Sequence, residues 1–244
     1  MKPFVLLATR AEDAAADEEF LAIARFGGLA ESELIRIRLE AEPLPPLSLA
    51  DYSGIIVGGS PFNSSDPPGS KGVVQQRVER ELAGLLDRVV AADFPFLGAC
   101  YGVGTLGTHQ GGVVDRRFGE PIGPAWIVLT DDGGRDPLLR GLPREFQAFV
   151  GHKEACAKLP PTAVLLAASD ACPVQMFRVK ENVYATQFHP ELDVAGLLTR
   201  IDVYRNAGYF PADQVEQVRS AVRAASVDQP AAILRNFVRR YARD

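Results

Sequence analysis

The sequence is poor in cysteine, in long apolar runs and in excess positive charge. Its three cysteines are an odd and sparse set for a secreted domain stapled by disulfides, so we expect a reducing, cytoplasmic location. No stretch approaches the roughly 18 consecutive apolar residues of a membrane helix. The run Phe4–Ala8 is too short for the apolar core of a signal peptide. We therefore expect neither a membrane partner nor a targeting segment.

The charge balance argues against nucleic acid as a partner. Lys and Arg number 26 and Asp and Glu number 31, which leaves a formal net charge of −5 at pH 7. A mildly acidic body repels phosphate backbones. Hydrophobic residues make up 47% and charged residues 23% of the 244 residues, as in globular proteins. A chain of this length buries enough surface to fold without a disulfide or a metal.

Short apolar runs alternate with helical patterns in the first half of the chain. The expected strands there are Phe4–Ala8, Leu34–Leu39, Gly54–Val57 and Phe94–Ala99, and the expected helices are Glu18–Phe26, Val74–Val90 and Tyr101–Thr108. The segment Ser60–Gly72 is rich in Pro, Ser, Asp and Gly, which predicts a surface loop.

Shorter strands and then helices are expected in the second half. The strands are Val113–Asp115, Ala125–Leu129, Phe146–Val150, Ala163–Ala168, Val174–Val179 and Val183–Phe188, and helices are expected to start near Pro211 and Pro230. No internal repeat and no long linker divides the chain. We therefore predict a single α/β domain over residues 1–244 with a mixed sheet and a C-terminal helical extension from about residue 192 to 244.

The sharpest local pattern surrounds Cys100. The buried run 94–99 leads through Gly-Ala-Cys-Tyr-Gly into an expected helix, which is the cysteine form of a nucleophile elbow. Gly98 and Gly102 remove side chains that would crowd the turn, in which the nucleophile is usually strained. The thiol then lies at the positive end of a helix, which favours a thiolate. The alternative is that Cys100 is an ordinary buried hydrophobic residue.

His189 is the candidate base for this thiol. It directly follows the expected strand Val183–Phe188, and α/β proteins gather their active sites at the carboxyl ends of parallel strands. Glu191 can turn back around Pro190 and accept a hydrogen bond from the far nitrogen of the imidazole. The alternative is a surface histidine that forms a salt bridge with Glu191.

The other two histidines carry weaker signals. His109 is expected to cap the end of a helix or to interact with its dipole. His152 stands in a Gly-His-Lys-Glu segment and either lines a substrate pocket or is an ordinary loop residue. A metal site built from His152, Glu154, His189 and Glu191 lacks the paired ligand spacing of known sites, so no metal is expected.

Acyl-transfer chemistry also needs hydrogen-bond donors for a developing oxyanion. The N–H of Tyr101, next after the candidate nucleophile, is one such donor by the geometry of an elbow. Gly58 and Gly59 follow the expected strand Gly54–Val57, and glycine lets a backbone approach a ligand closely, so this segment is the second candidate. Its alternative interpretation is a plain turn.

These segments occur in the order found in class I glutamine amidotransferases. The sequence resembles that family, especially stand-alone proteins similar to the glutaminase domain of GMP synthase, over roughly Gly54 to Glu191. The resemblance rests on residues 55–61 (Ile-Ile-Val-Gly-Gly-Ser-Pro), on the Cys100 elbow and on residues 184–191 (Tyr-Ala-Thr-Gln-Phe-His-Pro-Glu). It implies a flavodoxin-like fold with three α/β/α layers and a central mixed, mostly parallel sheet.

The resemblance also implies a reaction. Glutamine, a small-molecule substrate, would be hydrolysed through a γ-glutamyl thioester to glutamate and ammonia, without a cofactor. The implied site is a catalytic triad of Cys100, His189 and Glu191, an oxyanion hole from the backbones of Gly59 and Tyr101, and substrate-binding residues Gly58, Gly104 and His152. Family members pass the ammonia to a synthetase. Since no phosphate-binding glycine-rich loop occurs here, a separate synthetase subunit is the expected partner.

Gly104 is the main departure from the family pattern. The family usually has glutamine at this position, two residues after the second glycine of the elbow, where it helps to hold the substrate. Two alternatives therefore stay open: hydrolysis of γ-glutamyl peptides through the same thioester, and a non-catalytic binding or regulatory module that keeps the fold.

Overall fold

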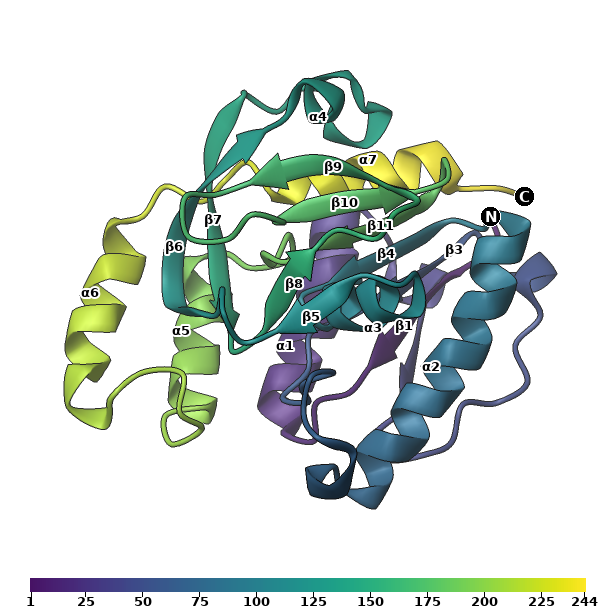
Figure 1. Cartoon of the computed structure of the whole chain (residues 1–244). Helices are drawn as coiled ribbons and strands as arrows, with labels where there is room; N and C mark the ends of the chain where they lie inside the picture. The colour runs from purple at the N-terminus through teal and green to yellow at the C-terminus, as the bar shows by residue number, and fades with distance from the viewer.

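Strands and helices alternate through the first part of the chain in a computed structural model, which describes residues 1–244 except for the side chain of Ala212 (Figure 1). The first elements are β1 Phe4–Ala8, α1 Asp13–Gly27, β2 Leu34–Arg38, β3 Gly54–Val57, α2 Val73–Ala92, β4 Phe96–Ala99 and α3 Tyr101–His109. The next are β5 Val113–Asp115, β6 Glu120–Leu129, α4 Asp131–Arg135, β7 Glu145–His152, β8 Ala155–Lys158, β9 Ala163–Ala168, β10 Met176–Val179 and β11 Val183–Thr186. The last helices are α5 Val194–Val203, α6 Val215–Ala224 and α7 Ala231–Tyr241. Short 3₁₀ turns lie at Glu31–Glu33, Leu49–Asp51, Pro68–Ser70, Pro137–Leu139 and Ala212–Gln214.

A nine-stranded mixed sheet forms the centre of the fold, in the order β2-β1-β3-β4-β11-β10-β9-β6-β7. Strands from β2 to β11 in this order run parallel, and those from β11 to β7 run antiparallel. β5 and β8 pair in a separate two-stranded sheet. β1, β3, β4 and β11 are buried along their whole length, which explains their mostly apolar sequences. The predicted α/β fold with a mixed sheet is confirmed.

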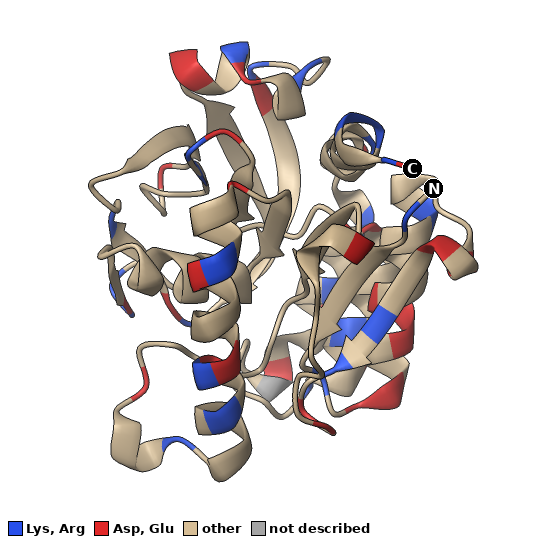
Figure 2. Cartoon of the chain, turned by 90° about the vertical axis from the view of Figure 1, so that its right-hand side faces the viewer, with Lys and Arg blue, Asp and Glu red and all other residues tan. Residues whose placement is uncertain are grey.

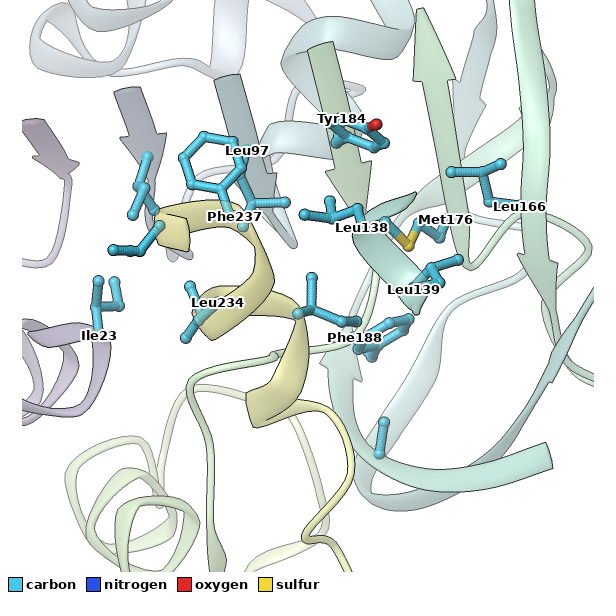
Figure 3. Close-up of a cluster of buried hydrophobic side chains, with 14 of the residues drawn as sticks. Ile23, Leu97, Leu138, Leu139, Leu166, Met176, Tyr184, Phe188, Leu234 and Phe237 are labelled. Atoms are coloured by element: carbon cyan, nitrogen blue, oxygen red, sulfur yellow. The ribbon is translucent and has the colours of Figure 1, made fainter. Parts of the chain in front are cut away.

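Helices cover both faces of this sheet. Side chains alternate along β1, so Leu6 packs in the cluster with α1 and α7 while Leu7 packs in the cluster with α2 and α3. Figure 3 shows Leu234 and Phe237 of α7 in the cluster that also contains Leu97 of β4. The three α/β/α layers are therefore present as expected. Each fully buried aliphatic or aromatic side chain contributes about 1.5–3 kcal/mol to stability.

The parallel register brings three candidate segments to one edge of the sheet. β4 pairs with β3 on one side and with β11 on the other. Gly58, Cys100 and Gln187 are the residues that follow β3, β4 and β11, so they leave the sheet at the same edge. The N–H of Cys100 donates to the carbonyl of Thr186 at 2.7 Å, which ties the turn after β4 to the end of β11. Ligands bind at this edge in open α/β sheets.

Two elements, α1 and β6, begin more than one residue earlier than the sequence predicts. α1 begins at Asp13 rather than Glu18, because the alanines at 14–16 favour helix and an acidic residue suits its positive end. β6 begins at Glu120 rather than Ala125, and a register shift against β7 accommodates the proline and glycine residues at its start. β8 and the five-residue α4 have no counterpart in the prediction.

Charged residues of both signs are interleaved on the elements in view in Figure 2. Many form surface ion pairs, such as Arg36 with Asp17 at 2.7 Å, and an exposed pair of this kind contributes about 1 kcal/mol or less.

In the part of the chain that the structure describes, no helix has the length and apolar character needed to cross a membrane.

Candidate active site

Cys100 lies in the turn between β4 and α3 with a strained backbone. Its φ of 53° and ψ of −81° fall in the positive-φ region that residues with a side chain rarely adopt, at a cost of about 1–3 kcal/mol. The side chain thereby leaves the strand direction and stands at the start of α3, where the helix dipole is positive. This is the geometry of a nucleophile elbow, and the catalytic role of Cys100 stays a prediction.

The two glycines of the elbow differ in what they permit. A Cβ on Gly98 would lie 2.6 Å from the Cα of Gly102, so only glycine at 98 allows β4 and α3 to approach this closely. Apart from its chain neighbours and the backbone of its own helix, a Cβ on Gly102 would meet none of the described atoms within 4 Å. The expectation that both glycines relieve crowding therefore holds for Gly98 and is wrong for Gly102.

His189 and Glu191 are buried and in direct contact. The Nδ1 of His189 lies 2.7 Å from Oε1 of Glu191, and the two residues are 5% and 1% exposed. Because a carboxylate only accepts, Nδ1 carries the proton and Nε2 keeps its lone pair. The alternative of a surface ion pair is wrong, since both side chains are buried.

Cys100 and His189 line the same narrow pocket. A second narrow pocket is also lined by Cys100, together with Tyr101, Gly104 and His152. The fold thus brings residues from far apart in the sequence into two pockets that share Cys100. Cys100 keeps part of its surface exposed to these pockets, unlike the buried Cys156 and Cys172.

The electrostatic environment keeps the resting thiol and imidazole uncharged. Burial raises the pKa of Cys100 to about 12, although Arg10 acts in the opposite direction. Burial also lowers the pKa of His189 below its ordinary value, against the raising effect of Glu191. Burial alone would raise the pKa of Glu191, but His189 and Arg200 outweigh it and hold that pKa below its usual range. The site therefore holds a thiol, a neutral imidazole and a carboxylate.

Gly58 and Gly59 pack against side chains of the protein itself. The N–H of Gly59 donates to Oε1 of Glu19 at 3.1 Å. A Cβ on Gly58 would lie 2.2 Å from a carboxylate oxygen of Glu19, and one on Gly59 would lie 2.4 Å from Arg10 and 2.7 Å from the His189 ring. The glycines thus permit a close approach, as expected, but to charged side chains. In this structure the Gly59 amide must leave Glu19 before it can bind an oxyanion.

Side chains from outside α3 occupy the space beside Gly104. A Cβ at Gly104 would lie 2.6 Å from Oγ of Ser64 and 2.7 Å from Oε1 of Glu154. The carboxylate of Glu154 accepts hydrogen bonds from the N–H groups of Ser64 and Ser65, each at 2.7 Å. Glu154 therefore holds the loop of residues 60–72 against α3. The loop and Glu154 occupy the space that a glutamine side chain at position 104 would need.

His152 belongs to a buried hydrogen-bonded network beside the second pocket. Its Nδ1 lies 2.8 Å from the carbonyl of Glu154 and its Nε2 lies 2.9 Å from Oε2 of Glu120. Gln175 donates to the same oxygen of Glu120 at 2.7 Å. The possible ligand atoms of Glu120, His152 and Cys172 lie within 4.8 Å of one another, but those of Glu120 and His152 already make hydrogen bonds to each other. The network orients the loop that carries Glu154.

Three charged residues around the site were not predicted. Arg10, Glu19 and Arg200 are 4%, 0% and 3% exposed, and each contacts a site residue or its neighbour. Arg10 follows β1 at the same sheet edge as Cys100, which was a usable signal. Glu19 and Arg200 lie on otherwise apolar helix faces, where a charged residue indicates a buried partner.

The fold and this geometry define an α/β protein with a cysteine at a nucleophile elbow beside a histidine–glutamate pair. The family model described as glutamine amidotransferase class-I matches residues 23–195. This chain belongs to the class-I glutamine amidotransferase family. The predicted family and the predicted fold class are both confirmed.

Curated relatives and solved structures agree with this assignment. The A subunit of a glutamine-hydrolyzing GMP synthase from Thermococcus kodakarensis is 33% identical over 123 residues, which are 50% of this chain and 63% of that protein. A glutamine-hydrolyzing GMP synthase of Thermosipho africanus is 32% identical over 115 residues, 47% of this chain and 22% of that protein. The chain thus spans less than two thirds of these relatives.

The fold as a whole is shared with solved structures. A glutamine amidotransferase from Thermotoga maritima superposes with a TM-score of 0.76 at 20% identity, over 99% of this chain and 98% of that one. A glutamine amido transferase from Methylobacillus flagellatus gives a TM-score of 0.72 at 16% identity, over 99% and 94% of the two chains. At these identities the likeness establishes the fold.

Proposed function

We propose that this chain hydrolyses the side-chain amide of glutamine to glutamate and ammonia, with Cys100 as the nucleophile. The observation that carries the proposal is the shared pocket of Cys100 and His189, in which Glu191 orients the imidazole at 2.7 Å. Membership of the class-I glutamine amidotransferase family supplies the substrate class.

The neutral resting pair defines the order of proton transfers. The sulfur of Cys100 attacks the amide carbon while its proton passes to Nε2 of His189. The imidazolium, stabilised by Glu191, then gives that proton to the departing nitrogen as the tetrahedral intermediate collapses to a γ-glutamyl thioester and ammonia. His189 next takes a proton from water, which attacks the thioester carbon, and returns that proton to the sulfur as the C–S bond breaks and glutamate is released.

The oxyanion of each tetrahedral intermediate needs backbone donors. The amide of Tyr101, the first residue of α3, adjoins Cys100 and is the proposed first donor. The amide of Gly59 is the proposed second donor after it exchanges Glu19 for the oxyanion. Substrate binding and a small movement of the Gly58–Gly59 turn are therefore coupled in this mechanism.

The thiol makes this proposal directly testable. Glutamate release is measured for the wild type, for Cys100→Ala and for Cys156→Ala, a control at a buried cysteine outside both pockets. We expect the rate to vanish in Cys100→Ala and to persist in the control. A diazo-ketone analogue of glutamine should label Cys100, as read by mass spectrometry. Unchanged glutamine hydrolysis in Cys100→Ala would falsify the proposal, and absence of labelling would favour a non-catalytic module.

We infer that the ammonia is passed to a separate synthetase subunit. The support is the similarity to a GMP synthase subunit from Thermococcus kodakarensis. The test is glutamine hydrolysis with and without candidate synthetase subunits or cell extract. A stimulated rate supports the inference, and an unchanged rate in every case contradicts it.

One observation favours a second substrate class, γ-glutamyl peptides. His189 protonates the leaving group, so that group lies on the His189 side of the sulfur. The pocket on this side is lined by Leu197 and Tyr204, whose side chains can contact the carbon atoms of a leaving group larger than ammonia. A kcat/KM for γ-glutamyl dipeptides well above that for glutamine would establish this class, and equal or absent turnover excludes it.

A further inference from the structure

A buried cluster of charged side chains adjoins the histidine–glutamate pair. Its members are Arg10, Glu19 and Arg200, none of which is more than 4% exposed. Buried charges are retained only when they are paired and hydrogen-bonded, so the contacts of each member show what it holds in place.

Arg200 contacts both members of the pair. Its Nη2 donates to Oε1 of Glu191 at 3.0 Å, and its Nη1 lies 3.0 Å from Nδ1 of His189. The same oxygen of Glu191 accepts from His189 at 2.7 Å. The carboxylate is therefore fixed from two directions, and the guanidinium lies against the edge of the imidazole ring that faces away from Nε2.

Glu19 in turn fixes the guanidinium groups. Its Oε1 lies 3.4 Å from Nη2 of Arg200 and 3.0 Å from Nε of Arg10. The same oxygen accepts the N–H of Gly59 at 3.1 Å. One carboxylate thus joins the glycine turn beside Cys100 to the residues that orient His189.

All three charged residues lie outside the part of the chain that matches the family model. That match covers residues 23–195, whereas Arg10 precedes α1, Glu19 lies in α1 and Arg200 lies in α5. The support of the pair is therefore contributed by the two flanks of the chain, which this fold packs together: α1 and α5 are in contact.

We propose that Arg200, anchored by Glu19, is a positioning residue that fixes the orientation and the proton position of the His189–Glu191 pair. This proposal rests on the proposed function and extends it to residues outside the family match. Arg200 carries a permanent positive charge, which beside the imidazole disfavours a second proton on the ring. The resting imidazole therefore stays neutral, with its Nδ1 proton directed to Glu191 and its lone pair on Nε2.

The charges around His189 act in opposite directions. Burial lowers the pKa of His189, Glu191 raises it, and Arg200 and then Arg10 lower it. Glu18 also faces Arg200, at 3.6 Å, and burial raises its pKa to about 7. Burial, Glu191 and Glu154 raise the pKa of Cys100, whereas Arg10 and, to a smaller extent, Arg200 lower it and so favour the thiolate. Loss of Arg200 should therefore raise the pKa values of His189 and Cys100 together.

Three variants separate positioning from structural support. Arg200→Met removes the charge and both contacts, Arg200→Lys keeps the charge without the two-pronged guanidinium, and Arg205→Met alters an exposed residue just beyond α5 as a control. We expect Arg200→Met to lower kcat for glutamine about 10- to 100-fold with KM changed less than about 3-fold. Arg200→Lys should lie between it and the wild type, and the control should be unchanged.

A second readout does not depend on glutamine. The rate of Cys100 alkylation by iodoacetamide is followed by mass spectrometry across pH, and its midpoint should move to higher pH in Arg200→Met. In the glutamine assay, the acid limb of the pH profile of kcat/KM should move to higher pH as well. Circular dichroism and thermal unfolding establish that each variant is folded, and if Arg200→Met is not, Arg200→Lys carries the test.

The outcomes are distinct. A folded variant at position 200 with the kcat and both pH profiles of the wild type overturns the positioning role, and so does equal loss in the control. If the wild type alkylates at Cys100 but never hydrolyses glutamine, the proposed function fails, while the alkylation profiles still decide the role of Arg200.

Discussion

The contrast between Gly98 and Gly102 gives the sharpest prediction about the elbow. In Gly98→Ala the new Cβ would lie 2.6 Å from the Cα of Gly102, whereas carbon atoms pack at about 3.5–4.0 Å. β4 and α3 must therefore separate by about 1 Å, and overpacking of this kind costs about 1–3 kcal/mol. A displacement of that size at Cys100 lowers the catalytic rate about 100-fold.

Gly102→Ala is the matched control within the same motif. Its Cβ meets none of the described atoms within 4 Å, and alanine is favoured over glycine in a helix by up to about 1 kcal/mol. We expect this variant to be at least as stable as the wild type. Urea denaturation with equal m-values gives the two free energies of unfolding, and glutamine kinetics gives the rates. Equal losses in both variants, or none in Gly98→Ala, would refute the close-packing argument.

Three further outcomes follow from the structure. Because His189 must be neutral to accept a proton and its pKa is lowered, activity should persist as pH falls through about 6.5 and be lost only below it; a loss of kcat/KM already above that pH contradicts this. Gly104→Gln should expose the loop Ser60–Gly72 to limited proteolysis, since the longer side chain displaces it, and unchanged cleavage would disprove the contact. Gly84→Ala, inside α2 where an added Cβ meets no described atom within 4 Å, should raise the free energy of unfolding by up to about 1 kcal/mol in urea denaturation.

The buried parallel strands were the most predictable part of the fold. β1 and β3 have the predicted bounds, because a strand covered on both faces needs apolar residues at every position. The start of β6 was missed because proline and glycine residues, which usually interrupt a strand, are accommodated there by a register shift. Such shifts depend on the neighbouring strand and leave no local pattern.

The candidate site divides in the same way. The turns after β3 and β4 are local features that short motifs reveal, and the parallel register then places them together. The contact of Glu19 with Gly59 spans 40 residues and that of Glu154 with Ser64 spans 90, so their partners follow only from tertiary packing. The role of the space beside Gly104 was for that reason invisible in the sequence.

The backbone of Cys100 has a consequence for heat resistance. A conformation with φ of 53° suits glycine, which pays no steric penalty there, better than cysteine or alanine. A protein with glycine at position 100 should therefore melt at a higher temperature than one with alanine there, although neither has a thiol. Thermal stability and reactivity therefore oppose each other at position 100. The cysteine found there supplies a thiol but is less favourable for stability than glycine would be.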